Sequence, residues 1–272
     1  MKNNTVSRSS EFFDLNRFWK YFVADIQDCA NRYGLSMLLL CVALPLCYLV
    51  GLTFRLLMHS NPVGFQLPFR LMIAGMAALI MFISSPSICY GYITDKKMGT
   101  RFLMLPASTF EKFLSMIVIC CVIIPLIFMI GTFISDSIIC LIDPNSGTSF
   151  AEALAANELR EAILAMPLSI NVMQLVGVFM NEIMTSSLLF LLGAIWFRRG
   201  KISKTIGMLI LFAILISMLT AVVFTTQVNE AFLQKALINT QNHPVLSATL
   251  PDMVLNLIVA GLIYLRLKKI SH

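Results

Sequence analysis

Apolar residues gather into six long runs along this chain, and short polar stretches separate them. An α-helix that crosses the hydrocarbon core of a membrane needs about 20 predominantly apolar residues. Each run is close to this length or longer, so the pattern predicts an all-α, polytopic membrane protein with six transmembrane helices. The last run is the most interrupted, because Pro251, Asp252 and Asn256 fall in its first half. The expected spans cover residues 35–58, 71–93, 113–134, 169–197, 206–226 and 249–267.

A different period precedes the first run. Between residues 10 and 33, apolar side chains recur at steps of three and four positions, which places them on one face of a helix. They are Phe12, Leu15, Trp19, Phe22, Ile26, Cys29 and Tyr33. Charged residues, Asp25 among them, fall largely off this stripe. The pattern predicts an amphipathic helix in the membrane interface, so that residues 1–34 form an N-terminal segment and residues 35–272 the transmembrane domain. A plain membrane anchor and an elbow that also contacts a partner protein fit the stripe equally well.

The distribution of Lys and Arg predicts the orientation. The chain is 58% hydrophobic and only 12% charged, whereas soluble domains carry about 25% charged residues. With the N-terminus placed inside, nearly all of the 20 Lys and Arg residues fall on the inner side. The exceptions are Arg55, Arg70, Arg160 and Lys235. Because inner loops retain positive charge, both termini are expected in the cytoplasm. The net charge of +6 is thus a topology signal and does not indicate a nucleic-acid partner.

Local signals predict where helices bend and begin. Pro45, Pro86 and Pro125 each remove a backbone donor inside a run and predict bends, and the serines beside Pro86 are expected to satisfy the freed carbonyls. On the outer side, residues 148–166 are expected to form a helix. Ser149 and Glu152 have the spacing of a capping box, in which each side chain satisfies a free backbone donor.

The sequence contains no catalytic constellation. It lacks a Gly-x-Ser-x-Gly, a His-Glu-x-x-His and a Walker-type glycine-rich motif, and its three histidines lie outside the apolar runs. The seven cysteines lack metal-ligand spacing, and a buried thiol behaves as a small apolar side chain. We therefore expect no enzymatic activity, no metal and no cofactor on this chain.

Asn181 and Glu182 lie near the middle of the fourth run. A carboxylate at the centre of a membrane helix costs free energy unless it is neutral, paired or in contact with water. These residues therefore predict a translocation pathway or a subunit interface. The alternative is a protonated Glu182 that hydrogen-bonds to Thr185 or Ser186. No second acidic group is expected at the same depth.

The most polar break links the second and third runs and is expected inside. Its residues are charged side chains and Gly-Thr, then Pro-x-Ser, then Glu-Lys: Asp95, Lys96, Lys97, Gly99, Thr100, Arg101, Leu105, Pro106, Ser108, Glu111 and Lys112. Thr100 or Ser108 can cap a short helix, and Pro106 fixes a turn. Nearby apolar side chains, including Met104 and Leu105, suit a groove on a partner protein. The plain alternative is a positive loop that only fixes the topology.

This loop resembles the first cytoplasmic loop of ABC-2 type transporter permeases. In that family Glu-Arg-x-x-Gly-Thr precedes a Leu-x-x-x-Pro-x-Ser stretch. Here Asp95 and Lys96 replace Glu and Arg, Gly99 and Thr100 match, and Pro106 and Ser108 match after a shorter spacer. The layout of an interfacial helix followed by six spans is also similar to that family.

The resemblance implies a permease subunit of an ATP-binding-cassette exporter in the plasma membrane, which is the inner membrane of a bacterium. A separate ATPase subunit, which carries the ATP and Mg²⁺, would dock on the loop, and a second permease copy or a relative would complete the pathway. The cargo would be lipid-like, peptide or drug-like. Two other functions stay open: a membrane scaffold or sensor that does not transport, and a secondary transporter that uses Glu182.

Overall fold

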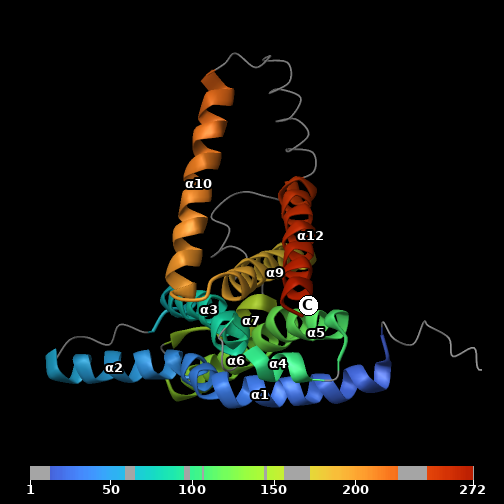
Figure 1. Cartoon of the computed structure of the whole chain (residues 1–272). Helices are drawn as coiled ribbons and strands as arrows, with labels where there is room; N and C mark the ends of the chain where they lie inside the picture. The colour runs from blue at the N-terminus through green and yellow to red at the C-terminus, as the bar shows by residue number, and fades with distance from the viewer. Residues whose placement is uncertain are drawn as a thin grey trace, which may run out of the picture.

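The computed structural model describes residues 13–58, 65–94, 99–105, 107–143, 146–155, 172–225 and 244–271. All regular structure in these segments is helical, which confirms the expected all-α class. The helices are α1 (Leu15–Cys41), α2 (Ala43–Met58), α3 (Leu67–Tyr90), α4 (Gly99–Met104), α5 (Thr109–Val118), α6 (Ile124–Ile142), α7 (Phe150–Ala155), α9 (Val172–Trp196), α10 (Lys201–Thr225) and α12 (Pro244–Ser271) (Figure 1). A 3₁₀ turn, η2 (Gly91–Thr94), follows α3, and a π-helical turn, η3 (Ile119–Ile123), joins α5 to α6.

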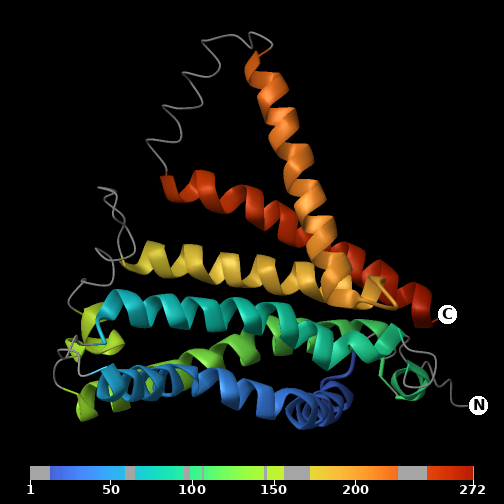
Figure 2. The ribbon, with the colours of Figure 1, turned by 90° about the vertical axis from the view of Figure 1, so that its left-hand side faces the viewer.

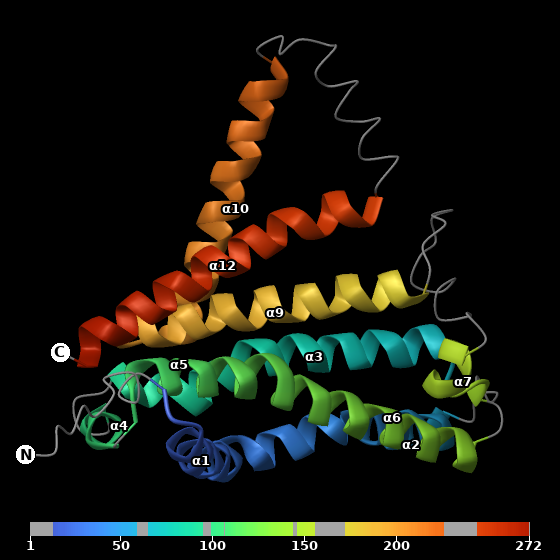
Figure 3. The ribbon, with the colours of Figure 1, turned by 90° about the vertical axis from the view of Figure 1, so that its right-hand side faces the viewer.

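The helices form a stack from which one helix departs. Figures 2 and 3 show α1 and α2 on one side, then α3 with α5 and α6, then α9 and α12, while α10 points away from the stack. The most extensive packing of α9 is against α12 and α3. Its Leu188, Leu191 and Ile195 are fully buried in the main apolar core. We refer to the end of the stack that holds α4 as the α4 end, and to the other as the α7 end.

Four helical stretches of the described chain are long and apolar enough to cross a membrane. They are Leu67–Thr94, Thr109–Ile142, Lys201–Met218 and Thr249–Ile270. A fifth crossing results if the bent pair formed by α1 and α2 counts as one span. The apolar part of α9, Met180–Trp196, is shorter. Several long apolar helices are typical of a multi-pass membrane protein. The sixth crossing, through α9, remains a prediction.

The first break in the chain lies later than the sequence suggested. α1 continues through residue 34, where the interfacial helix was expected to end, and the bend of 41° comes between Cys41 and Ala43. Pro45 explains the position, because a proline ring clashes with the carbonyl four residues earlier and offers no N–H to it. That carbonyl, of Cys41, instead accepts a hydrogen bond of 2.7 Å from the Ser135 hydroxyl on α6.

The other two prolines are accommodated without ending the helical run. Ahead of Pro125, the Ile124 N–H donates to the carbonyl of Ile119, which produces the π turn. Pro86 lies inside α3. The nearby Ser84 donates to the Ile80 carbonyl at 2.6 Å and not to the Phe82 carbonyl that Pro86 frees, so the expected pairing was wrong in its partner.

A sealed ion pair, which we call the outer ion pair, fastens the α7 end. Arg70 on α3 donates to Asp136 on α6 over 2.6 Å, and neither side chain has any exposed surface. The second Asp136 oxygen accepts the Phe150 N–H at the start of α7, also over 2.6 Å. The predicted capping box of Ser149 and Glu152 is confirmed just before it. The predicted helix over residues 148–166 is described only as far as Ala155, and its remainder lies outside the described residues.

Candidate coupling site

The loop singled out by its sequence lies at the α4 end, beside the beginning of α1. Figure 3 shows α4, the start of α5, the first turns of α1 and the C-terminus together at this end. The backbone of α4 and α5 is described from Gly99, except at residue 106. Asp95, Lys96, Lys97 and Pro106 lie outside the described residues.

Glu111 on α5 contacts Arg17 on α1. We call this contact the inner ion pair, and it links the two helices. The carboxylate accepts from Arg17 Nε at 2.9 Å and Nη2 at 2.8 Å. It also accepts the Asp14 N–H at 2.9 Å, at the N-cap of α1. Arg17 is 36% exposed, whereas the Glu111 side chain has no exposed surface. One buried carboxylate therefore holds the starts of two helices that lie far apart in the sequence.

The same carboxylate completes the cap of α5. Ser108 accepts the Glu111 N–H through its hydroxyl at 3.2 Å, and its own N–H donates to Glu111 Oε2 at 2.8 Å. Of the two capping residues expected, Thr100 or Ser108, it is Ser108 that caps a helix here, and this helix is α5. Each member of the pair satisfies a backbone donor that an α-helix leaves free at its start.

A lysine fastens α4 to α5. The Lys112 Nζ donates to the Phe102 carbonyl at 2.8 Å and lies 4.8 Å from the centroid of the Phe102 ring. Phe102 is buried, whereas the neighbouring Met104 is 83% exposed and Leu105 is also exposed. The short helix thus turns one aromatic side chain inward and two apolar side chains outward. The side chains of Thr100 and Arg101 lie outside the described residues.

Gly99 begins α4 where no side chain fits. A Cβ atom at this position would lie 2.6 Å from the Ile93 carbonyl oxygen. Real Cβ atoms do not approach backbone this closely. The glycine of the loop motif therefore lets α4 fold back onto η2.

Asp25 is a buried carboxylate that the sequence pattern did not single out. It accepts hydrogen bonds from Ser115 on α5 at 2.5 Å and from Tyr90 on α3 at 3.0 Å. The Asp25 side chain is buried. Asp25 is off the apolar stripe of α1 in the sequence, yet it is buried because α3 and α5 cover that side. Asp25 thereby ties α1, α3 and α5 together, at a position further along α1 than the inner ion pair.

The second predicted site, in α9, separates into two parts. Asn181 faces α12, where its Nδ2 donates to Asp252 at 3.4 Å and its Oδ1 accepts from Asn256 at 3.3 Å. Glu182 is exposed on the surface of this chain. Thr185 donates to the Asn181 carbonyl at 2.9 Å. The expectation of no second acidic group at this depth was wrong, since Asp252 lies within hydrogen-bonding distance of Asn181.

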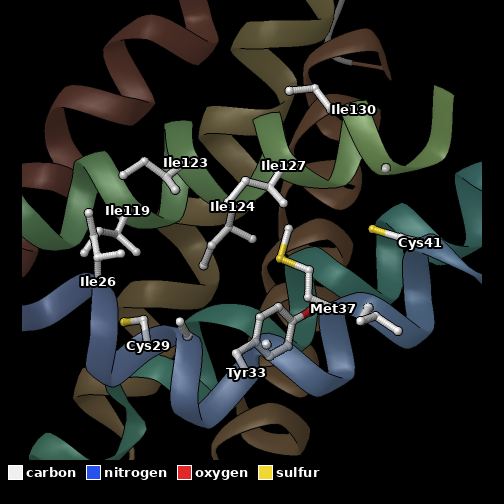
Figure 4. Close-up of a pocket in the computed structure, with 14 residues that line it drawn as sticks. Ile26, Cys29, Tyr33, Met37, Cys41, Ile119, Ile123, Ile124, Ile127 and Ile130 are labelled. Atoms are coloured by element: carbon white, nitrogen blue, oxygen red, sulfur yellow. The ribbon is translucent and has the colours of Figure 1, made fainter. Parts of the chain in front are cut away.

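An apolar groove runs between α1 and the η3–α6 segment. Figure 4 shows Tyr33 and Met37 of α1 facing isoleucines of the opposite wall. The groove has a volume of about 410 Å³ and is lined almost wholly by apolar atoms. The Tyr33 hydroxyl is within 2.9 Å of Ser84 Oγ. Such a wall suits a hydrocarbon chain.

Comparison with known proteins finds no matching family model, no matching curated protein and no matching solved structure. Among the described residues, no group of three His, Cys, Asp or Glu side chains is placed to hold a metal ion. At the α4 end, charged and capping contacts join α1, α4 and α5, and apolar side chains are exposed beside them.

Proposed function

We propose that this chain is the membrane-spanning permease subunit of an ABC-2 type exporter. It crosses the plasma (bacterial inner) membrane six times, with α9 as the fourth span and with both termini and the α4 end in the cytoplasm. A separate ATPase subunit binds ATP and Mg²⁺ and hydrolyses the nucleotide. A second permease copy, or a relative, faces this one across the pathway.

The observation that carries the proposal is the inner ion pair beneath the loop that resembles the family. A partner that pushes on α4 moves α5 through Lys112 and the start of α1 through Glu111. Asp25 then passes the displacement to α3. A joined unit of this kind suits a rigid-body switch between two arrangements of the spans.

The contact with the ATPase is assigned to the exposed side of α4. Met104 and Leu105 are apolar side chains that protrude at the expected cytoplasmic end. An apolar side chain that enters a groove is a common anchor of protein interfaces. The sequence places three positive residues, Lys96, Lys97 and Arg101, within a few positions of this anchor.

The pathway is assigned to the exposed face of α9 that carries Glu182. An ionisable side chain at membrane depth faces a water-filled space or another protein chain and not lipid. Glu182 has an exposed position on the single chain, and the second copy would cover it. Asn181 would hold the neighbouring polar surface in place through Asp252 and Asn256.

Co-purification tests the proposal. The tagged chain, extracted from its own host in mild detergent, should retain an ATPase with a Walker motif. Met104→Asp should reduce the recovered ATPase by about tenfold, the size typical of a central interface residue. Met104→Leu is the matched control and should retain it. If no such ATPase is recovered, or if Met104→Asp retains it fully, the proposal is wrong. A scaffold would bind its partner without stimulating ATP hydrolysis after reconstitution.

A secondary transporter is the second candidate, because two carboxyl groups flank Asn181. In proteoliposomes without ATP, an ion gradient should then drive uptake or release of the cargo. Glu182→Gln and Asp252→Asn should each abolish that flux. If the chain is instead an exporter subunit, the wild-type chain should show no flux under these conditions. Measurement of flux by the wild-type chain without ATP therefore separates the two functions.

A further inference from the structure

Positive residues from two distant parts of the chain lie close together at the α4 end. The turn between α9 and α10 carries Arg198 and Arg199, and α10 adds Lys204, all exposed. The last turns of α12 carry Arg266 and the exposed Lys269. Figure 2 shows the end of α12 beside the α9–α10 turn.

A tryptophan connects the two parts. The guanidinium carbon of Arg266 lies 5.3 Å from the centroid of the Trp196 ring. Trp196 is 51% exposed, at the last residue of α9 and two positions before Arg198. Exposed tryptophans at the ends of membrane helices lie at the level of the lipid headgroups. The contact therefore holds Arg266 at the depth of the lipid phosphates.

Arg266 lacks an acceptor within the described chain. Its Nε is buried and has no hydrogen-bond partner among the described residues. Residues 197–205 and 257–272 contain neither Asp nor Glu. A guanidinium matches a phosphate through two parallel N–H···O hydrogen bonds, one of them from Nε or a terminal nitrogen. The Arg266 residue as a whole is part-exposed, and a phosphate from outside the chain would bind its guanidinium.

The turn is held in place from the other side. Lys201 donates to the Gly91 carbonyl, and Thr94 donates to the Phe197 carbonyl at 3.4 Å. These contacts with η2 fix the backbone on both sides of Arg198 and Arg199. Arg198 and Arg199 therefore lie on a turn that its contacts with η2 hold in place.

We propose that Arg266 and the Arg198–Arg199 turn bind the headgroup phosphate of an anionic phospholipid. The occupant is a lipid and not a free anion, because exposed apolar side chains lie within four residues of the arginines along the chain. They are Leu262 and Leu265 of α12 and Ile202 of α10. The acyl chains would lie along these side chains. This site does not depend on the proposed transport function.

Native mass spectrometry of the purified chain in mild detergent tests this site. The probes are phosphatidylglycerol, phosphatidylcholine and inorganic phosphate. Phosphatidylglycerol should bind in preference to phosphatidylcholine. Arg266→Gln should weaken its binding by about tenfold, as expected for the loss of hydrogen bonds to a charged group. The double variant Arg198→Gln/Arg199→Gln, on an exposed turn, should fold normally and weaken it as well. Arg266→Lys, which keeps the charge and loses Nε, should fall between the wild type and Arg266→Gln.

Lys20→Gln is the matched control, because it removes one exposed positive charge elsewhere on the same end. It should leave binding unchanged. Equal loss in Lys20→Gln would mean a general charge effect and would overturn the site. Equal binding of phosphatidylcholine, or full binding by either arginine variant, would overturn it too. Displacement of the lipid by an equal concentration of inorganic phosphate would show a free-anion site and not a lipid site.

Discussion

The two arginine–carboxylate pairs in the described part of the chain lie at opposite ends of the helix stack and differ in their contact with water. In the outer ion pair, neither Arg70 nor Asp136 has exposed surface. In the inner ion pair, Glu111 is buried but Arg17 is 36% exposed. Opening the outer pair would leave two charges without water, whereas Arg17 can turn into water while backbone N–H groups still hold Glu111.

This difference in exposure indicates that the α7 end is fixed, whereas the α4 end can move. A buried charge that loses its partner is strongly destabilising, so the outer pair holds α3, α6 and α7 in a single arrangement. In the inner ion pair Arg17 is part-exposed, so water can replace its contact with Glu111, and such a contact can be remade during a conformational cycle. The α4 end is also where the docking of a partner is proposed. The comparison can be tested by changing each end separately.

The largest effect is expected from Asp136→Asn. It leaves Arg70 buried without a counter-charge, and this should lower the free energy of unfolding by about 3–5 kcal/mol. Thermal unfolding in detergent measures the change. The double variant Arg70→Met/Asp136→Leu should recover most of the loss, because a matched apolar pair replaces a buried ion pair at little cost. If Asp136→Asn melts at the same temperature as the wild type, the outer ion pair does not stabilise the α7 end.

Gly99→Ala should have the next largest effect. The new Cβ would meet the Ile93 carbonyl oxygen at 2.6 Å, and forcing the backbone apart should cost about 1–3 kcal/mol. Loss of protease resistance around α4 reports the change. Gly261→Ala is the control, since a Cβ there meets nothing within 4 Å. If both variants are equally resistant to protease, the close contact between α4 and η2 does not stabilise α4.

Glu111→Ala should have a smaller effect on stability. It removes the reciprocal cap of α5, which is worth about 1–2 kcal/mol, while Arg17 turns into water. Hydrogen exchange should increase at the first turns of α1 and α5 together, because one side chain holds both. Arg17→Gln should loosen α1 alone, since the Ser108 and Glu111 contacts remain. Faster exchange confined to α5 in Glu111→Ala would argue against the link.

Contacts between near neighbours were predictable. The capping boxes at Ser108 and Ser149 follow from a spacing of three residues, and each is present. Pro45 predicted a bend, and the bend follows Cys41. The partner of Glu111 was not predictable, because Arg17 lies 94 positions away and nothing in either local pattern points to the other. The same holds for Ser135 and the carbonyl freed by Pro45.

The sequence by itself determined the helical class, the apolar runs and the caps, because helix length, period and capping depend on residues within a few turns of each other. Only the tertiary structure decided which charges are buried. Asp25 lies on the polar side of α1 in the sequence and is covered by α3 and α5, while Glu182 lies in an apolar run and is exposed. Burial is a property of the neighbouring helices, and it appears only when they pack.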